Sequence, residues 1–245
     1  MKVAAIGDIH GTTKFIDCYK KISENDTDVE KIIVLGDWFD PYEDIDFNTM
    51  VERYKEFVNI WKSDDRIISI LGNHDIGGYI EYNDRTNRTE RCGKKIQLIS
   101  DLIEPNLSES YLTYKIGDYM FSHAGVSQVW LNDIGEYNRT HSRIDYVDAI
   151  MNCKKGWSED QLADICQFYH YDWTRTGDNP HQSCVWIRPQ SLCSCAIEGY
   201  HQVVGHTRLE EITKVSLDNG KDLWLVDDNH KPNYLILNIE ENVRS

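Results

Sequence analysis

Five short apolar runs in this chain end in small residues that are followed by side chains able to bind metal ions. The carboxylate, amide and imidazole groups at these positions belong to Asp8, His10, Asp37, Asn73, His123 and His206. Hydrolysis at a pair of metal ions needs such ligands on rigid elements, with one ligand shared between ions about 3.5–4 Å apart. Mixed nitrogen and oxygen ligands suit Mn, Fe or Zn better than the all-oxygen shell that Ca prefers. The pattern therefore predicts one two-metal site.

Asp37 is the natural shared ligand, because a carboxylate can bind two ions through its oxygens. Asp8 and His10 alternate in sequence, so in an extended turn both side chains point the same way and can hold one ion. A neutral amide and two imidazoles remain for the other ion, from Asn73, His123 and His206. Two ions would lower the pKa of a bridging water, which makes hydroxide available near neutral pH for attack on phosphorus.

The apolar runs themselves predict strands. Residues 32–35 are four consecutive apolar residues, which is typical of a strand buried on both faces of a parallel sheet. Strands are predicted at 2–7, 31–35 and 66–71, and apolar residues at helical spacing predict a helix between each pair. This βαβαβ order predicts a parallel sheet with right-handed crossovers. Ligands bind at the carboxyl ends of the strands in such sheets, which is where the candidate residues lie.

The second half of the chain predicts a hairpin, helices and a closing run of strands. Gly117 and Asp118 are a hairpin turn signal between strands at 111–115 and 118–122, and Ser158 with Gln161 has the form of a capping box. The predicted helices cover 96–103, 142–151 and 158–169, and the predicted strands cover 201–205, 211–217, 223–227 and 234–239. Residues 76–95 and 171–192 are predicted loops. No linker divides residues 1–245, so we expect a single domain.

The composition restricts the possible partners. A net charge of −15 argues against a protein that grips nucleic acid through its phosphates, since such binders need clustered Lys and Arg. The negative net charge is compatible with a small phosphorylated substrate, because bound metal ions would make the electrostatic field at the site positive. No run approaches the length of a membrane span, and no export signal is present. The seven cysteines are an odd, irregularly spaced set, which indicates reduced thiols and a cytoplasmic location.

The sequence blocks GDIHG, GDWFD, GNHD, HAG and GHT occur in this order between Gly7 and Thr207. Together they resemble the signature of the calcineurin-like metallophosphoesterases. The resemblance implies an α/β fold with two sheets packed as a sandwich and flanked by helices, and a dinuclear metal site at the strand carboxyl ends. It also implies two divalent metal ions, with Mn as the first expectation and Fe, Zn, Mg and Ni as alternatives.

The resemblance assigns roles position by position. It implies a first metal held by Asp8, His10 and Asp37, and a second held by Asp37, Asn73, His123 and His206. It also implies that His74 protonates the leaving-group oxygen and that Asp40 orients His74. A histidine is suited to proton transfer near neutral pH, and a carboxylate on its far nitrogen would fix the tautomer.

The last block narrows the branch. GHT lacks the second histidine of the GHxH block found in many phosphodiesterases, and with HAG it is similar to the branch that holds bacterial and phage serine/threonine protein phosphatases and symmetrical diadenosine tetraphosphate hydrolases. That branch carries a phosphate-binding arginine where this chain has Pro41, and Glu where it has Asp75. An arginine from elsewhere must bind phosphate, because its fork matches two phosphate oxygens. Arg188 is our first candidate, with Arg208 and Arg175 as alternatives.

The expected reaction is hydrolysis of phosphate monoesters by a metal-bridging hydroxide, on a phosphoprotein or a nucleotide. The alternatives are a dinucleoside polyphosphate hydrolase, a phosphodiesterase, and a scaffold that binds partners without catalysis. The chain keeps every ligand and His74, which speaks against the scaffold. The remaining histidines have no such sequence frame, and a structural or surface role is expected for His141, His170, His181, His201 and His230.

Overall fold

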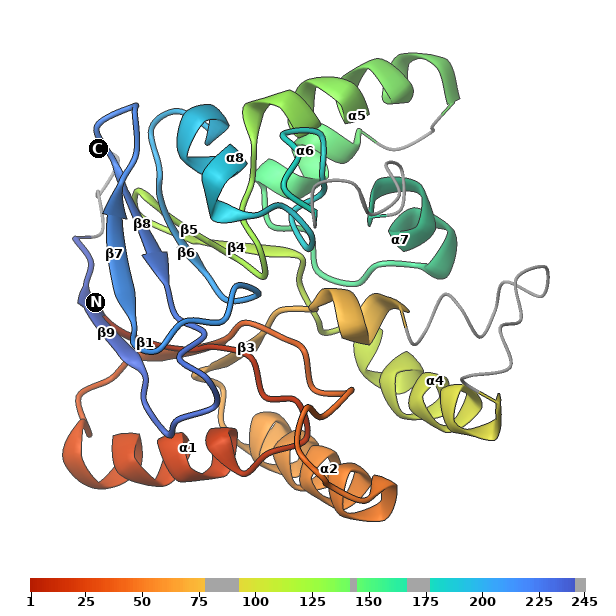
Figure 1. The fold of residues 1–245 in the computed structure, drawn as a ribbon, viewed down its shortest axis with the longest axis vertical. Coiled ribbons are helices and arrows are strands. Elements are labelled where there is room, and N and C mark those ends of the chain that lie inside the picture. The colour runs from red at the N-terminus through yellow and green to blue at the C-terminus, as the bar shows by residue number, and fades with distance from the viewer. Residues whose placement is uncertain (78–92, 142–144, 167–176, 241–245) are drawn as a thin grey trace.

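A computed structural model describes residues 1–77, 93–141, 145–166 and 177–240, and it contains two sheets (Figure 1). The first sheet has the order β3-β2-β1-β9. Its strands are β1 (Lys2–Ile6), β2 (Lys31–Val34), β3 (Ile67–Ser69) and β9 (Leu235–Asn238). The second sheet has the order β4-β5-β6-β8-β7. Its strands are β4 (Thr113–Ile116), β5 (Tyr119–Ser122), β6 (His201–Val204), β7 (Thr213–Ser216) and β8 (Asp222–Leu225).

The parallel pairings follow the predicted pattern. β1 pairs with β2 and β2 with β3 in parallel, which confirms the βαβαβ unit. In the second sheet β5, β6 and β8 are parallel neighbours, while β4 and β5 form the predicted hairpin around residues 117–118. The carboxyl ends of β1, β2, β3, β5 and β6 are therefore the ends that carry the six candidate ligands.

Period-two alternation explains how the layers pack. In β2, Ile33 points into an apolar cluster that also contains Phe121 and Val203 of the second sheet. Its neighbours Ile32 and Val34 point the other way, into the cluster that contains the helices. Because successive side chains of a strand face opposite sides, a continuous apolar run fits a strand that is covered on both faces.

Helices cover the outer faces of the two sheets. Against the first sheet pack α1 (Lys14–Asn25) and α2 (Phe47–Ser63), and α8 (Pro189–Cys195) packs against the second. The remaining labelled helices are α4 (Gly93–Leu107), α5 (Gln128–His141), α6 (Tyr146–Met151) and α7 (Glu159–Cys166). This is the predicted two-sheet α/β sandwich flanked by helices. No helix in the described part of the chain has the length and hydropathy needed to cross a bilayer.

Local predictions differ in their outcome. The capping box is present, because the Ser158 N–H donates to Gln161 Oε1 and the Gln161 N–H donates to Ser158 Oγ. The loop predicted at 76–95 is too long, since residues 73–77 are helical and α4 begins at Gly93; residues 78–92 lie outside the described part. The loop predicted at 171–192 is wrong at its end, because α8 begins at Pro189, a residue suited to a first helical position.

A buried ion pair ties α1 to the turn between β8 and β9. Lys14 Nζ lies 2.9 Å from Asp228 Oδ1, and both side chains have a relative exposure of 0%. The other oxygen of Asp228 accepts a hydrogen bond from the Asn233 side-chain amide at 2.8 Å. Lys14 and Asp228 neutralise each other's charge. The turn between β8 and β9 and the first turn of α1 are therefore held together.

Replacing Asp228 by Ala should leave the Lys14 ammonium buried without its counter-charge and lower the free energy of unfolding by about 3–5 kcal/mol. Urea denaturation measures this difference. Glu52→Ala, which breaks the exposed pair with Lys55, is the control and should change stability little. The double variant Lys14→Met with Asp228→Leu should recover much of the loss, because it removes both charges. An Asp228→Ala variant as stable as Glu52→Ala would contradict this account.

Candidate metal centre

The turns after β1 and β2 are joined through their backbones. The Ile9 and His10 N–H groups donate to the Asp37 carbonyl at 3.2 and 2.7 Å, and the Gly11 N–H donates to the Trp38 carbonyl at 2.8 Å. These backbone hydrogen bonds hold Asp8 and His10 beside Asp37 without the help of a bound ligand.

The candidate residues adopt an unusual backbone conformation. His10, Asp37, Asp40 and His206 have φ values of 45°, 55°, 59° and 62°. Positive φ disfavours residues that carry a Cβ, and such strain persists only where surrounding contacts impose it. Four of the predicted site residues therefore have their side chains set by the tertiary structure rather than by local preference.

Two glycines make room for the carboxylates. A Cβ on Gly72 would stand 2.1 Å from Asp37 Oδ1, and a Cβ on Gly205 would stand 2.1 Å from Asp8 Oδ1. Any side chain at either position would displace a carboxylate. The glycines of the GNHD and GHT blocks are thus required by close approach.

The first cluster consists of Asp8, His10 and Asp37. Each of them has a relative exposure of 1%, and their ligand atoms lie within 4.8 Å of one another. His10 Nε2 is 3.6 Å from Asp37 Oδ2 and 3.8 Å from Asp8 Oδ2. A divalent ion bound between these three atoms would have two carboxylates and one imidazole.

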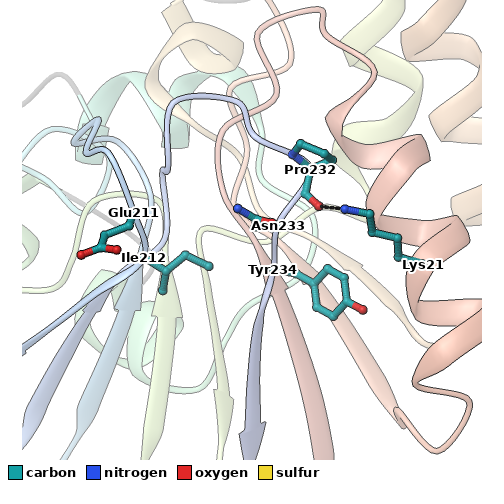
Figure 2. Close-up of a pocket in the computed structure, with 6 residues that line it drawn as sticks. All are labelled: Lys21, Glu211, Ile212, Pro232, Asn233 and Tyr234. Carbon is teal, nitrogen blue, oxygen red and sulfur yellow. Dashed lines mark hydrogen bonds between the residues drawn. The ribbon is translucent and has the colours of Figure 1, made fainter.

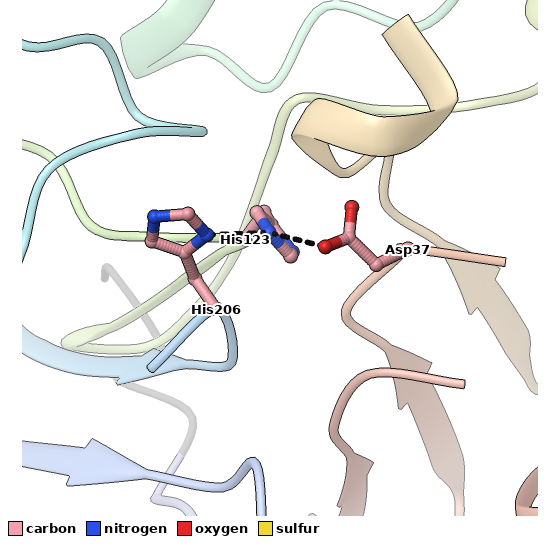
Figure 3. Close-up of side chains that lie close together, drawn as sticks. All are labelled: Asp37, His123 and His206. Atoms are coloured by element: carbon pink, nitrogen blue, oxygen red, sulfur yellow. Dashed lines mark hydrogen bonds and ion pairs between the residues drawn. The ribbon is translucent and has the colours of Figure 1, made fainter. Parts of the chain in front are cut away.

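The second cluster consists of Asp37, His123 and His206 (Figure 3). It shares Asp37 with the first cluster. His123 Nε2 lies 3.3 Å from Asp37 Oδ2, 3.2 Å from His206 Nδ1 and 2.9 Å from Asn73 Oδ1. The same oxygen of Asp37 thus faces His10 on one side and His123 on the other, while its second oxygen accepts the His74 N–H at 3.0 Å. One oxygen of Asp37 is thus common to both clusters.

Backbone carbonyls orient the three imidazoles. His10 Nδ1 donates to the Phe39 carbonyl at 2.8 Å and His123 Nδ1 donates to the Leu35 carbonyl at 2.6 Å. His206 Nε2 donates to the Trp186 carbonyl at 3.1 Å. Because a carbonyl only accepts, the opposite nitrogen of each neutral ring carries a lone pair that is available to a metal ion.

The arrangement of lone pairs fits a cation. His123 Nε2 and His206 Nδ1 face each other at 3.2 Å, where two lone pairs repel unless positive charge lies with them. Burial disfavours a charged imidazole, yet Asp37 and Asp8 raise the pKa of His123 to about 10. For His10 burial also disfavours charge, and Asp8 with Asp37 raises the pKa to about 9. His10 and His123 thus favour positive charge despite their burial, whereas burial and then the charge of His123 lower the pKa of His206.

Asp75 joins the turns after β2 and β3. Its Oδ2 accepts the N–H groups of Asp37 and Gly72, each at 2.9 Å, and its Oδ1 accepts the Trp38 N–H at 2.8 Å. Burial, followed by the charge of Asp37, raises the pKa of Asp75 to about 6, against the effect of these N–H groups. The sequence identified Asp75 only as a departure from the related branch, which has Glu at this position. Asp75 caps backbone N–H groups of two separate turns.

His74 and Asp40 form the predicted pair. His74 Nδ1 is 2.7 Å from Asp40 Oδ2. Burial disfavours protonation of His74, but Asp37 and Asp40 outweigh it and raise the pKa of the imidazole. The hydrogen bond from His74 is the largest effect on Asp40 and lowers the pKa of that carboxyl. Asp40 therefore holds the imidazole in one orientation at the edge of the two clusters.

The arginine candidates lie on different sides of the site. Arg188 donates to the His206 carbonyl at 2.9 Å and to Thr207 Oγ1 at 3.2 Å, beside the second cluster. The Arg208 guanidinium lies over the Tyr42 ring, 3.9 Å from its centroid, and the Tyr42 ring is 4.5 Å from that of His10 in the first cluster. Arg175 lies outside the described residues.

A surface pocket elsewhere holds none of the candidate ligands (Figure 2). Its lining consists of Lys21, Glu211, Ile212, Pro232, Asn233 and Tyr234. Lys21 is engaged with the Pro232 carbonyl at 2.7 Å, so the pocket offers no comparable group of ligand atoms.

The sequence matches the family of calcineurin-like phosphoesterases over residues 1–207 of 245. This chain is a calcineurin-like phosphoesterase. It is accordingly a phosphoric ester hydrolase of a family that depends on two metal ions. A comparison with curated protein sequences gives no match.

Three solved structures are similar to this phosphoesterase. A cold-active protein tyrosine phosphatase is 19% identical, with 94% of this chain and 71% of that chain covered and a TM-score of 0.48. A protein serine/threonine phosphatase from Saccharomyces cerevisiae is 12% identical, with coverages of 99% and 82% and a TM-score of 0.45. A metallophosphoesterase from Sphaerobacter thermophilus is 15% identical, with coverages of 92% and 75% and a TM-score of 0.40.

Asp75→Ala should remove the acceptor of three backbone N–H groups beneath the site. A buried unpaired donor costs about 1–3 kcal/mol, so the free energy of unfolding should fall by about 3 kcal/mol or more. Asp75→Asn, which keeps one acceptor oxygen, should lose less. Urea denaturation measures both, with the exposed Asp65→Ala as the control. The assignment fails if Asp75→Ala is no less stable than Asp65→Ala.

Proposed function

We propose that this phosphoesterase hydrolyses phosphate monoesters at two divalent metal ions. The observation that carries the proposal is the pair of buried ligand clusters that share Asp37 Oδ2. The proposed ligands are Asp8, His10 and Asp37 for the first ion and Asp37, Asn73, His123 and His206 for the second. Manganese suits this mixture of carboxylate, amide and imidazole donors.

When bound, the two ions supply an activated water and neutralise the charge of the phosphate. The protein contributes orientation. Asp37 keeps the two clusters at a fixed separation, because its backbone N–H is held by Asp75 and its Oδ1 by the His74 N–H. Carbonyl groups hold the imidazoles so that their lone pairs face Asp37.

His74 is the proposed proton donor to the leaving-group oxygen, and Asp40 is its positioning residue. Because the Nδ1–H of His74 is bound to Asp40, the imidazole gains or loses its proton at Nε2. His74 is half-buried and Asp40 is exposed, so this pair lies where a substrate can approach.

Arg188 and Arg208 are the proposed phosphate-binding residues. The contacts of Arg188 to His206 and Thr207 hold its guanidinium beside the second cluster. Arg208 is exposed and stacks on Tyr42 without a hydrogen bond or ion pair to any other residue that the structure describes. Its donors are therefore available to phosphate oxygens on the first-cluster side, and a planar fork suits that task.

One observation favours hydrolysis of dinucleoside polyphosphates as a second candidate function. Tyr42 keeps 61% of its surface exposed although its ring lies 4.5 Å from that of His10. An exposed aromatic ring beside the reaction centre can stack on a nucleobase. The substrate class is therefore tested with both kinds of compound.

The proposal is tested with chelator-treated protein to which Mn²⁺ is returned. We expect p-nitrophenyl phosphate to be hydrolysed much faster than bis-p-nitrophenyl phosphate, and both activities to require the metal. Asp37→Asn should abolish turnover, because it removes the shared ligand. Faster hydrolysis of the diester would overturn the monoesterase. Diadenosine tetraphosphate cleaved far faster than either compound would establish the second candidate.

The role of His74 predicts a dependence on the leaving group. His74→Asn should slow phenyl phosphate, whose leaving oxygen needs a proton, by about 10²- to 10⁴-fold. It should slow p-nitrophenyl phosphate much less, because that phenolate leaves unaided. Asp40→Asn should show the same trend more weakly. His181→Asn, at an exposed histidine paired with Asp133, is the control for both substrates. Equal losses on the two esters would exclude proton donation by His74.

A further inference from the structure

The turn after β8 repeats the pattern of the metal-binding turns. β8 is parallel to β6, and its apolar run is followed by Asp227, Asp228, Asn229 and His230. A carboxylate and an imidazole thus stand at the carboxyl end of one more strand. His230, for which a structural or surface role is expected from the sequence, has its ring 5.3 Å from that of His10.

Two side-chain atoms of this turn are buried without a partner. Asp227 has a relative exposure of 2%, and its Oδ1 makes no hydrogen bond with the described residues. His230 Nε2 is likewise buried and unpaired. A buried polar atom that lacks a partner costs about 1–3 kcal/mol, so each such atom points to a water or ion that completes it.

Both groups lie next to the first cluster, because the His230 ring is 5.3 Å from that of His10 and the Asp227 Cα is 3.0 Å from where a Cβ on Gly7, the neighbour of Asp8, would stand. Burial and then the charge of Asp8 raise the pKa of Asp227 to about 7, with Lys14, His10 and Arg208 opposing. The same four residues surround His230, whose pKa is lowered to about 4, chiefly by burial. An imidazole nitrogen can be a hydrogen-bond donor or an acceptor, so the unpaired His230 Nε2 can serve one water in either role.

The turn is held rigidly in this position. Asp228, between the two unpaired residues, is fixed by the buried Lys14. Asn229 and His230 have φ values of 61° and 59°. The His230 ring lies nearly parallel to that of Tyr42, with an interplanar angle of 19° and a centroid separation of 5.8 Å. The orientation of both groups is thus set by the fold.

The first cluster is also the one with fewer ligands. Asp8, His10 and Asp37 offer three ligand atoms, whereas the second cluster gains Asn73 as a fourth residue. An ion such as Mn²⁺ prefers octahedral coordination, so water must fill the remaining positions at the first ion. Buried water needs about two to four polar partners. Asp227 and His230 are not in the group of atoms within 4.8 Å that forms the first cluster, which fits contact through water rather than direct ligation.

We propose that Asp227 and His230 hold the water that completes the coordination of the first metal ion, and so set the affinity of that site. The inference rests on the proposed two-metal centre. It assigns to the turn between β8 and β9 a positioning role that none of the five sequence blocks contains.

The test is a calorimetric titration of chelator-treated protein with Mn²⁺. His230→Phe keeps an aromatic ring beside Tyr42 but removes both nitrogens, and Asp227→Leu keeps the branched shape at Cγ but removes both oxygens. We expect either variant to bind Mn²⁺ at the first site about 10- to 100-fold more weakly, which is the usual effect of losing an outer partner of a metal site. Binding at the second site should not change.

A second series identifies which ion is affected. Asp8→Asn should leave only the second site measurable, and adding His230→Phe to it should cause no further loss. His201→Gln is the control, because His201 is a half-buried histidine at the start of β6, away from the strand carboxyl ends. It should bind both ions as the wild-type protein does.

Two results would overturn the inference while the metal centre stands. One is wild-type affinity at both sites in His230→Phe and Asp227→Leu. The other is weaker binding when His230→Phe is added to Asp8→Asn, which would indicate a general disturbance. A wild-type protein that binds fewer than two Mn²⁺ ions would instead overturn the proposed centre, and this inference with it.

Discussion

The buried charge of Asp37 is the constraint on which the rest of the site depends. Its carboxylate has a relative exposure of 1%, and an ionised carboxylate that is removed from water is stable only with compensating charge and hydrogen bonds. One oxygen faces two imidazoles and the other accepts a backbone N–H. The positive φ of Asp37 and the absence of a side chain at Gly72 both serve this placement. A neutral residue at position 37 would leave the two imidazoles and the His74 N–H without the negative charge that they surround.

Much of this arrangement could be predicted from sequence, because parallel strands bring their carboxyl ends to one edge. Apolar runs followed by Asp8, Asp37 and His123 are local signals, and the sheet then brings them together without further information. The helix α5 and the start of α8 were not predicted. In α5 the signal was present but not used, since Trp130, Leu131, Ile134 and Tyr137 stand at helical spacing and pack in the core. In α8, a seven-residue helix, Leu192 is the one buried residue, so the segment carries no apolar period. The sequence identified the capping box at Ser158 correctly because its two hydrogen bonds are local.

What sequence could not show are the contacts that only the tertiary structure creates. Asp75 could be recognised as a capping acid, but its bonds to the turn after β2 depend on how β2 and β3 pair. Pro41 stands where the related branch carries an arginine, and Tyr42 follows it. The Arg208 guanidinium, from the turn after β6, lies over the Tyr42 ring. Asp227 and His230 did carry a local signal, since they follow a strand-like run in the same way as the other candidates. Their separation from the five sequence blocks kept this signal from being used.

The hydrogen bond between the His206 N–H and Asp8 joins residues that are 198 positions apart in the sequence. During synthesis at about 5–20 residues per second, Asp8 therefore precedes its partner by about 10–40 s. Throughout that interval the first sheet lacks β9, and Asp8 lacks the His206 N–H that it binds in the folded chain. The candidate metal centre is thus completed late in translation, and a chain released before position 206 would lack both the His206 imidazole and the backbone N–H that binds Asp8.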